Sequence, residues 1–295
     1  PLIEACRDHE INDLAQATGR DRRPRSASVA FGAEQRPVLV TTRPIDGGGT
    51  WSVLLSLTDL EEFQRIDRVR RDFVANVSHE LRTPLASIRA MAETIAADPT
   101  MEASVAAGFL ERITDEVDRL ANLTSDLLDL SRVESGAIEI HPAAEVVTDT
   151  LATAADAVRH LAEQAGVTIE IRSSTERPCT IDKAIVIRIV TNLLDNAVKF
   201  SPPGSRVLVD AELERSMLRI CVADNGPGVP AADLARVFER FFKGDRSREA
   251  GGTGLGLAIV KHLAKIHGGS ASAESEEGVG TTFTVLLREL DAPAT

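Results

Sequence analysis

The strongest constraint on the fold lies between residues 61 and 135, where apolar side chains recur at steps of three and four along two runs. This spacing places them on one face of a helix, so each run predicts an amphipathic helix. The first run contains Phe73, Val77, Leu81, Leu85, Ile88, Met91 and Ile95, and the second contains Val105, Phe109, Ile113, Val117, Leu120, Leu123, Leu127 and Leu130. Asp98-Pro99-Thr100 separates the runs, and Ser135-Gly136 ends the second. A single hairpin leaves apolar surface in water, so we expect a homodimer in which two hairpins form a four-helix bundle.

The segments that flank this hairpin have different patterns. Residues 1–60 combine a helix-like start with two strand-like stretches, Pro37–Ile45 and Trp51–Leu57, split by the turn Asp46-Gly47-Gly48-Gly49. That is too little for a stable core, so the segment resembles the end of a domain. Residues 138–290 alternate between helix-like and strand-like stretches. Strands are expected at Val167–Ile171, Val207–Glu212, Leu218–Ala223 and Thr281–Leu287. Helices are expected at Val146–Ala165, Lys183–Phe200 and Leu255–His267. This order predicts a mixed sheet covered on one face by helices.

Composition excludes several classes of protein. The 295 residues carry a net charge of −12, and aromatic residues make up only 3%, with no tyrosine, which argues against a nucleic-acid binder. Three distant cysteines, Cys6, Cys179 and Cys221, form no disulfide framework and favour a reducing compartment. No apolar run of about 18 residues occurs, as a membrane span would need. The sequence starts at Pro1 without a methionine, so we expect a piece of a longer protein.

His79 falls between two residues of the first apolar stripe and therefore points away from it. Thr83, four residues later, shares the exposed face, and Glu80 lies at the flank of the stripe. Pro84 removes an N–H and frees the carbonyl of Glu80, which predicts a bend near His79. An imidazole beside a carboxylate can act as a nucleophile. Spacing alone nevertheless favours a solvated histidine.

Two polar motifs in the later segment suit a nucleotide. Asn192, Asn196 and Lys199 fall at i, i+4 and i+7 on one face of the helix predicted at 183–200. Amide oxygens suit Mg²⁺, and an ammonium group can meet phosphate. The run Asp224-Asn225-Gly226-Pro227-Gly228 follows an apolar strand, where a carboxylate can accept a hydrogen bond from the exocyclic amine of adenine. Its glycines let the backbone approach a flat ring. Taken singly, a solvated helix face and an ordinary turn explain these motifs as well.

A third motif, Gly252-Thr253-Gly254-Leu255-Gly256, opens a predicted helix. Backbone N–H groups at a helix N-terminus bind anions. The motif is neither a Walker sequence nor a dinucleotide fingerprint, because the glycine spacing differs from both. The preceding stretch, Lys243 to Gly251, is polar and glycine-rich, as a mobile lid would be.

Together and in this order, the motifs resemble those of sensor histidine kinases of two-component systems. Residues 73–85 resemble the phosphoacceptor box, and the three polar motifs resemble the N, G1 and G2 boxes of the GHKL ATP-binding fold. Phe238-Glu239-Arg240-Phe241-Phe242 is similar to the F box, and Gly278–Phe283 to the final glycine-threonine strand entry. The resemblance covers residues 61–290, and the Arg-rich run from Arg65 to Asp72 makes the PhoR-like phosphate-regulon sensors the most similar subgroup.

The resemblance implies a multidomain chain. Residues 1–60 would be the C-terminal part of a PAS-like α+β sensor domain, and residues 61–136 the dimerisation and histidine phosphotransfer domain, an α-helical hairpin that forms a dimeric four-helix bundle. Residues 137–290 would be the catalytic ATP-binding domain, an α/β two-layer sandwich of the GHKL or Bergerat type, and 291–295 a tail. The chain would be a cytoplasmic portion, attached to a membrane only through a segment outside it.

The resemblance also implies the chemistry, with ATP and Mg²⁺ as cofactors. His79 would take the phosphoryl group with Glu80 accepting a proton, an aspartate of a response regulator would receive it, and Thr83 would position the water for dephosphorylation. Asn192 and Asn196 would hold Mg²⁺, while Asp224 would read adenine. The residues implied in nucleotide binding beyond these are Lys199, Gly226, Gly228, Arg240, Lys243, Gly252, Thr253, Gly254, Leu255, Gly256, Leu257 and Thr282.

Two other functions fit parts of this sequence. An ATP-driven conformational machine of the same fold, of the gyrase or Hsp90 type, needs a water-activating acid in the ATPase domain and gives no reason for the box around His79. A non-catalytic dimeric sensor scaffold would bind nucleotide without incorporating phosphate. Incubation with labelled ATP and candidate receivers distinguishes both from a histidine kinase.

Overall fold

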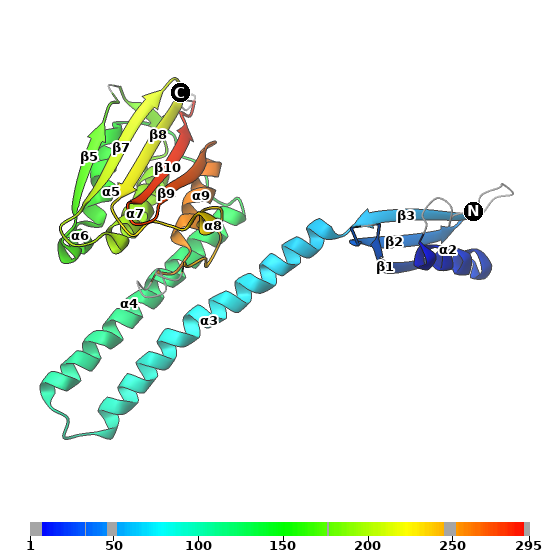
Figure 1. Cartoon of the computed structure of the whole chain (residues 1–295), viewed down its shortest axis with the longest axis horizontal. Coiled ribbons are helices and arrows are strands. Elements are labelled where there is room, and N and C mark those ends of the chain that lie inside the picture. The colour runs from blue at the N-terminus through cyan, green and yellow to red at the C-terminus, as the bar shows by residue number, and fades with distance from the viewer. Residues whose placement is uncertain (1–7, 33, 46–51, 176, 245–251, 292–295) are drawn as a thin grey trace. The chain divides into compact units, whose positions relative to one another are not determined.

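The structure, a computed structural model, describes residues 8–32, 34–45, 52–175, 177–244 and 252–291 (Figure 1). The turn predicted at 46–49 and residues 245–251 of the predicted lid lie outside these ranges, as do Cys6 and Trp51. The chain divides into two units, Pro1–His79 and Glu80–Thr295.

The first unit contains one helix and a three-stranded antiparallel sheet. The helix is α2 (His9–Asp21), and the strands in sheet order are β1 (Arg25–Phe31), β2 (Arg36–Pro44) and β3 (Val53–Asp59). Asp8 caps the helix, because its carboxylate accepts the backbone N–H of Ile11 at 3.1 Å. The predicted helix and two strands are present, and β1 is a further strand that the pattern did not predict.

The core of this unit lies between the helix and the sheet. It consists of Ile11 from α2 with Val29, Val38 and Val40 from β1 and β2. Beside it, the hydroxyls of Thr18 and Thr42 lie 2.7 Å apart in a hydrogen bond, and both residues are fully buried. Each hydroxyl is thereby satisfied by the other, as buried polar groups require.

The two predicted amphipathic helices are confirmed as α3 (Glu61–Ala97) and α4 (Ala103–Glu134). Helix α3 contains the boundary between the two units and continues through Pro84. The turn between the helices is held by Asp98, whose carboxylate accepts the backbone N–H of Thr100 at 2.9 Å. The C-terminal half of α4 packs against α9 (Gly256–Ile266), and Leu123 and Leu130 of α4 are buried.

The second unit contains the predicted mixed sheet. Strand β5 runs parallel to β7 and all other neighbours are antiparallel, in the order β5 (Thr168–Ser173), β7 (Arg206–Glu214), β8 (Met217–Asp224), β10 (Gly280–Arg288) and β9 (Ser270–Glu276). Side chains alternate along the strands, so that Leu218, Ile220 and Val222 of β8 are fully buried. Figure 1 shows the helices on one face of this sheet.

Three helices cover that face: α5 (Val147–Ala157), α7 (Lys183–Phe200) and α9. Their apolar faces form the core with the buried side of the sheet. Helix α7 has the predicted bounds, and Asp182 caps it by accepting the backbone N–H of Ile185 at 3.0 Å. The remaining elements are α6 (Arg159–Ala165), α8 (Ala231–Leu234) and the short pair β4 (Ala143–Glu145) with β6 (Cys179–Ile181).

One prediction about these elements was wrong in detail, and one strand of the sheet was missed. The single helix expected at Val146–Ala165 is two helices, because Val158 leaves the helical conformation with φ of −107° and ψ of 5°. Strand β9 was not predicted, because its sequence, SASAESE, has small and charged residues where strand patterns have β-branched ones. It is an edge strand paired only with β10, which tolerates such residues.

Candidate functional site

Asp224 ends β8 with its carboxylate held in one orientation. Its Oδ1 atom accepts the backbone N–H of Gly226 at 2.8 Å and that of Thr281 at 3.2 Å. Burial raises the pKa of this carboxyl, and the two hydrogen bonds oppose that rise by favouring the charged form. Both backbone bonds go to the same oxygen, and among the described residues no hydrogen bond to Oδ2 is found.

Two hollows adjoin Asp224, with volumes of about 370 and 380 Å³. Thr281 and Thr282 line the first, and Arg206 and Leu208 line the second. Asn192, Asn196 and the glycine motif line neither hollow among the described residues, so these volumes do not outline the phosphate end of the predicted site.

Gly228 shows why the second motif needs a glycine. Its φ is +71°, and a Cβ atom there would lie 2.3 Å from the carbonyl oxygen of Glu276. Both the backbone conformation and the close approach to β9 therefore exclude other side chains.

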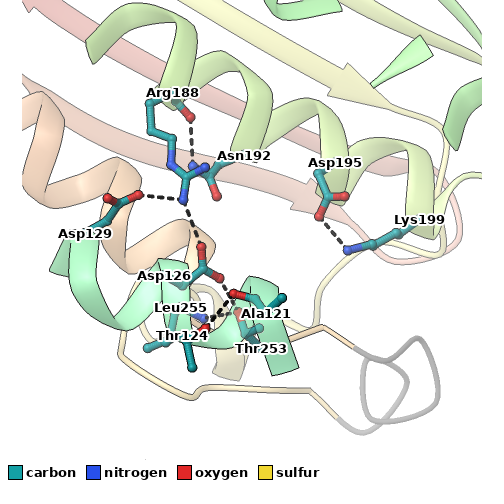
Figure 2. A network of polar contacts seen from close by, with 10 residues as sticks. All are labelled: Ala121, Thr124, Asp126, Asp129, Arg188, Asn192, Asp195, Lys199, Thr253 and Leu255. Atoms are coloured by element: carbon teal, nitrogen blue, oxygen red, sulfur yellow. Dashed lines mark hydrogen bonds and ion pairs between the residues drawn. The ribbon is translucent and has the colours of Figure 1, made fainter. Parts of the chain in front are cut away.

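The polar face predicted for α7 is present. Asn192 donates from Nδ2 to the carbonyl of Arg188 at 2.8 Å. Its Oδ1 would lie 2.9 Å from a Cβ atom on Gly256, so α7 and the start of α9 meet closely at this glycine. Asn196 is half-buried on the same helix, and Lys199 pairs with Asp195 at 2.6 Å (Figure 2).

The glycine motif leads into α9, which begins at Gly256. The hydroxyl of Thr253 accepts the backbone N–H of Leu255 at 3.2 Å, which shapes the turn that enters the helix. Phe241, from the F-box segment, donates its backbone N–H to the carbonyl of Gly254 at 2.8 Å. The F-box and glycine motifs are therefore directly bonded, as the resemblance to one nucleotide site implied.

The F-box segment is anchored to the sheet through its aromatic rings. Phe238 packs edge-on against Phe283 of β10, with ring centroids 6.2 Å apart. The guanidinium of Arg236 lies 4.7 Å from the ring centroid of Phe242. Arg240 is half-buried in the same segment.

The predicted phosphoacceptor residues lie on α3. His79 and Thr83 are exposed and one helical turn apart, which agrees with the predicted face. Glu80 is half-buried, and both its carboxylate oxygens accept from Lys243 Nζ at 2.7 Å. Arg119 of α4 lies 3.7 Å from the same carboxylate. The sequence assigned Lys243 to the nucleotide and did not predict this pairing.

The sequence analysis also missed two carboxylates near the end of α4. Asp126 and Asp129 both contact Arg188 of α7, and Asp126 also accepts the hydroxyl of Thr253 (Figure 2). Burial raises the pKa of Asp126, while the Thr253 hydrogen bond and the Arg188 charge oppose the rise. The only signal in the sequence was their spacing of three residues within an apolar stretch of the helix.

Comparison with known proteins agrees with this geometry. Residues 69–136 match the His Kinase A (phospho-acceptor) domain, and residues 181–291 match the histidine kinase-, DNA gyrase B- and HSP90-like ATPase. The first range contains His79 and the second contains every residue of the three polar motifs. The pair of domains defines a two-component signalling protein, and the chain belongs to the sensor histidine kinase family.

Individual relatives support the family. The chain is 38% identical over 238 residues to the sensor-like histidine kinase SenX3 of Mycobacterium tuberculosis, covering 79% of this chain and 57% of SenX3. The PhoR-like subgroup expected from the sequence is consistent with this similarity. The chain thus spans a little over half the length of this curated relative.

Solved structures share the fold. Full-length ShkA in complex with AMPPNP is 31% identical, with a TM-score of 0.56 over 76% of this chain and 47% of ShkA. Histidine kinase ThkA in complex with the response regulator protein TrrA is 18% identical, with a TM-score of 0.60 over 95% of this chain and 83% of ThkA. Among the described residues, no helix has the length and apolar character needed to cross a bilayer.

Proposed function

We propose that this chain transfers the γ-phosphoryl group of ATP to His79 and then to an aspartate on a separate response regulator. The observation that carries the proposal is the meeting of Asn192 with Gly256, which brings the two phosphate-end motifs into one site on the ATPase fold. ShkA, a relative of this chain, is solved with the ATP analogue AMPPNP, and ThkA, which shares its fold, is solved with a response regulator.

Each part of the nucleotide has matching groups on this chain. Oδ2 of Asp224, which has no hydrogen bond to the part of the chain that the structure describes, suits the exocyclic amine of adenine, since Oδ1 already accepts two backbone N–H groups. The backbone from Thr253 to Leu257 suits the phosphates, with Lys199, Arg240 and Lys243 as their cationic partners. The amide oxygens of Asn192 and Asn196 are hard ligands that fit Mg²⁺. When bound, the ion would neutralise phosphate charge.

The chemistry at α3 follows from the residue types. A ring nitrogen of His79 attacks the γ-phosphorus, the bond from that phosphorus to the β,γ-bridging oxygen breaks, and ADP leaves. Glu80 is the group we assign to accept the imidazole proton. Phosphoryl transfer is accelerated mainly by positioning and charge neutralisation, which Lys199, Arg240 and Lys243 would supply. In the second step an aspartate oxygen of the regulator attacks the same phosphorus and releases His79.

The domain division also remains a proposal. We assign residues 1–60 to the end of a PAS-like sensor domain, 61–136 to dimerisation and phosphotransfer, and 137–290 to catalysis, with 291–295 as a tail. The sheet and helix of the first unit and the packing of α5, α7 and α9 on one sheet face support the first and third assignments. We further propose that the chain is the cytoplasmic portion of a longer sensor.

The test is incorporation of labelled phosphate. We expect His79→Ala to abolish acid-labile label from γ-labelled ATP, because the variant lacks the nucleophile. Binding of ATP, measured by calorimetry, should remain within about twofold of wild type, since His79 lies outside the ATPase domain. Wild-type levels of label on the variant would disprove the role of His79. Nucleotide binding by the wild type without any label would favour the non-catalytic scaffold.

A further inference from the structure

Two carboxylates of α4 share one guanidinium of the catalytic part. Arg188 Nη2 on α7 lies 3.1 Å from Asp126 Oδ1 and 2.7 Å from Asp129 Oδ2 (Figure 2). The contact with Asp126 is a charge-assisted hydrogen bond, and the contact with Asp129 is an ion pair. Arg188 therefore joins α4 to the helix that carries the proposed Mg²⁺ ligands.

The second oxygen of Asp126 reaches a different element. Its Oδ2 accepts the hydroxyl of Thr253 at 2.9 Å, and Thr253 belongs to the glycine motif assigned to the phosphates. One carboxylate of α4 is thus bonded to α7 through Oδ1 and to the phosphate segment through Oδ2.

Arg188 and Thr253, the two residues that Asp126 contacts, are themselves hydrogen-bonded to residues of the proposed nucleotide site. The carbonyl of Arg188 accepts the amide of Asn192, and Asn192 in turn meets Gly256. The backbone N–H of Leu255 is occupied by Thr253, the same side chain that Asp126 holds. Asp126 is therefore bonded directly to Thr253 of the glycine motif and, through Arg188, to the helix that carries Asn192.

A second carboxylate of the hairpin, that of Glu80, pairs with Lys243, another residue assigned to the phosphates. Lys243 donates to both oxygens of Glu80 at 2.7 Å, and its side chain is only 14% exposed. Two residues assigned to the phosphates, Thr253 through its backbone and Lys243 through its ammonium group, are thus each bound by a carboxylate of the helical hairpin. A carboxylate and a phosphate compete for the same donors because both are oxyanions.

We infer that Asp126 is an internal competitor of the ATP phosphates, which holds the catalytic part on α4 in a form with low affinity for nucleotide. The inference rests on the proposed function. In this form the Asp126 carboxylate takes the Thr253 hydroxyl, and its charge with that of Asp129 opposes the triphosphate. Binding of ATP and docking on α4 then exclude each other. By linkage, each weakens the other by the same factor.

The first experiment measures the affinity of the full chain for AMPPNP by calorimetry. Asp126→Asn keeps the size of the side chain but removes its charge, and Asp118→Asn makes the same change at an exposed position on α4. We expect AMPPNP to bind about tenfold more tightly to Asp126→Asn, because a larger fraction of molecules is competent to bind. The Asp118→Asn variant should match the wild type.

Affinity of Asp126→Asn equal to or weaker than that of wild type would overturn the inference while leaving the proposed function intact. Failure of the wild type and both variants to bind AMPPNP would instead overturn the proposed function, and the inference with it. An equal gain in Asp118→Asn would show a general charge effect and would also overturn the inference.

A second measurement needs no substitution. Backbone amide hydrogen exchange of the wild-type chain is followed over the residues from Ala121 to Val133, with and without saturating AMPPNP. We expect exchange in this segment to become faster when AMPPNP is bound, because the nucleotide releases α4 from Arg188 and Thr253. Unchanged or slower exchange would overturn the inference even if Asp126→Asn did not fold.

Discussion

At the scale of single residues, Asp224 illustrates how the backbone selects one orientation of a carboxylate. Two N–H groups, from Gly226 and Thr281, hold the same oxygen, and burial disfavours the charged form of the group. A ligand that donates a hydrogen bond to Oδ2 would stabilise the charged carboxylate and so offset part of the cost of burying it. The residue is therefore suited to recognise a donor such as an amine, and unsuited to meet a phosphate.

The variant Asp224→Asn tests this assignment. We expect ATP binding to weaken by about 1.5–3 kcal/mol, the typical contribution of a hydrogen bond to a charged group. The amide can still accept the two backbone N–H groups, so the pocket should keep its shape. A nucleotide that lacks the exocyclic amine serves as the control, and its affinity should change much less. Equal losses for both nucleotides in calorimetry would show that Asp224 does not read the base.

The role proposed for Thr83 also concerns a single group, the hydroxyl that would position water for dephosphorylation. It is exposed and one turn beyond His79, and replacement by Ala is sterically mild in a helix. We expect Thr83→Ala to autophosphorylate within a few-fold of wild type. Dephosphorylation of the phospho-regulator should fall on the order of tenfold or more, equivalent to ~1.4 kcal/mol in the barrier.

The two rates of Thr83→Ala are measured separately, with labelled ATP for the first and purified phospho-regulator for the second. A parallel fall in both rates would mean that Thr83 is structural. If neither rate falls, the water is positioned by another group or the phosphatase activity is absent.

At the scale of elements, helix α9 is held against α7 at both of its ends. It begins at Gly256, which lies close to the side chain of Asn192, and it is followed by His267, which is fully buried. The Nε2 atom of His267 accepts the backbone N–H of Asp182 at 3.1 Å, which links the end of α9 to the cap of α7. Neutral imidazole is required for that bond, because an imidazolium has no acceptor.

The pH dependence of stability follows from this burial. Burial lowers the pKa of His267 below its ordinary value of 6.5, although the charge of Asp182 opposes the shift. As the pH falls through about 6.5, the unfolded chain binds a proton that the folded chain resists, so the free energy of unfolding decreases. The contribution of neutral His267 to the free energy of unfolding is therefore fully present above about pH 6.5 and decreases as the pH falls below it.

His267→Gln measures this contribution, because a glutamine oxygen can replace the acceptor and does not titrate. Between about pH 7.5 and about pH 5.5, we expect the wild type to lose ~1 kcal/mol more unfolding free energy than the variant. Denaturant titrations at the two pH values give both numbers. The same pH dependence in both proteins would exclude His267 as its source.

The elements also show which parts of the fold and of the site could be predicted from the sequence. Helix α7 was predicted with its bounds because an aspartate cap, an apolar face and a serine-proline end all agree. The break at Val158 carries no glycine or proline, so local sequence gave no sign of it. The nucleotide motifs were found through their joint order, which resembles the boxes of the GHKL fold, since each motif alone fits an ordinary helix face or turn. Asp126 and Asp129 were missed because their partner, Arg188, is distant in the chain, and a charge on a helix ordinarily indicates solvent.

At the scale of the whole molecule, the helical hairpin leaves apolar side chains without cover in a single chain. Leu85, Leu110 and Val117 are 55%, 57% and 49% exposed. Full burial of one such side chain contributes about 1.5–3 kcal/mol, so a symmetric interface that covers them is strongly favoured. We therefore expect the protein to be dimeric in solution.

The substitution Leu110→Glu tests the dimer. Because the change occurs in both subunits, we expect the dissociation constant to rise at least about 100-fold, as measured by sedimentation. Val146→Glu is the matched control, since Val146 is 49% exposed but lies outside the hairpin. A dimer of unchanged affinity in Leu110→Glu would place the interface elsewhere, and a monomeric wild type would exclude it altogether.

The buried hydroxyl pair of Thr18 and Thr42 has a consequence for how such a sequence can drift. Without the Thr42 hydroxyl, that of Thr18 would be an unsatisfied group in an apolar setting, whereas Thr42 without Thr18 would keep the carbonyl of Arg25 at 3.4 Å as its acceptor. Two valines of the same shape would fill the site about as well as two threonines. Across lineages, replacement of Thr42 by valine should therefore be accompanied by replacement of Thr18. The combination of threonine at position 18 with valine at position 42 should be the rarest of the four.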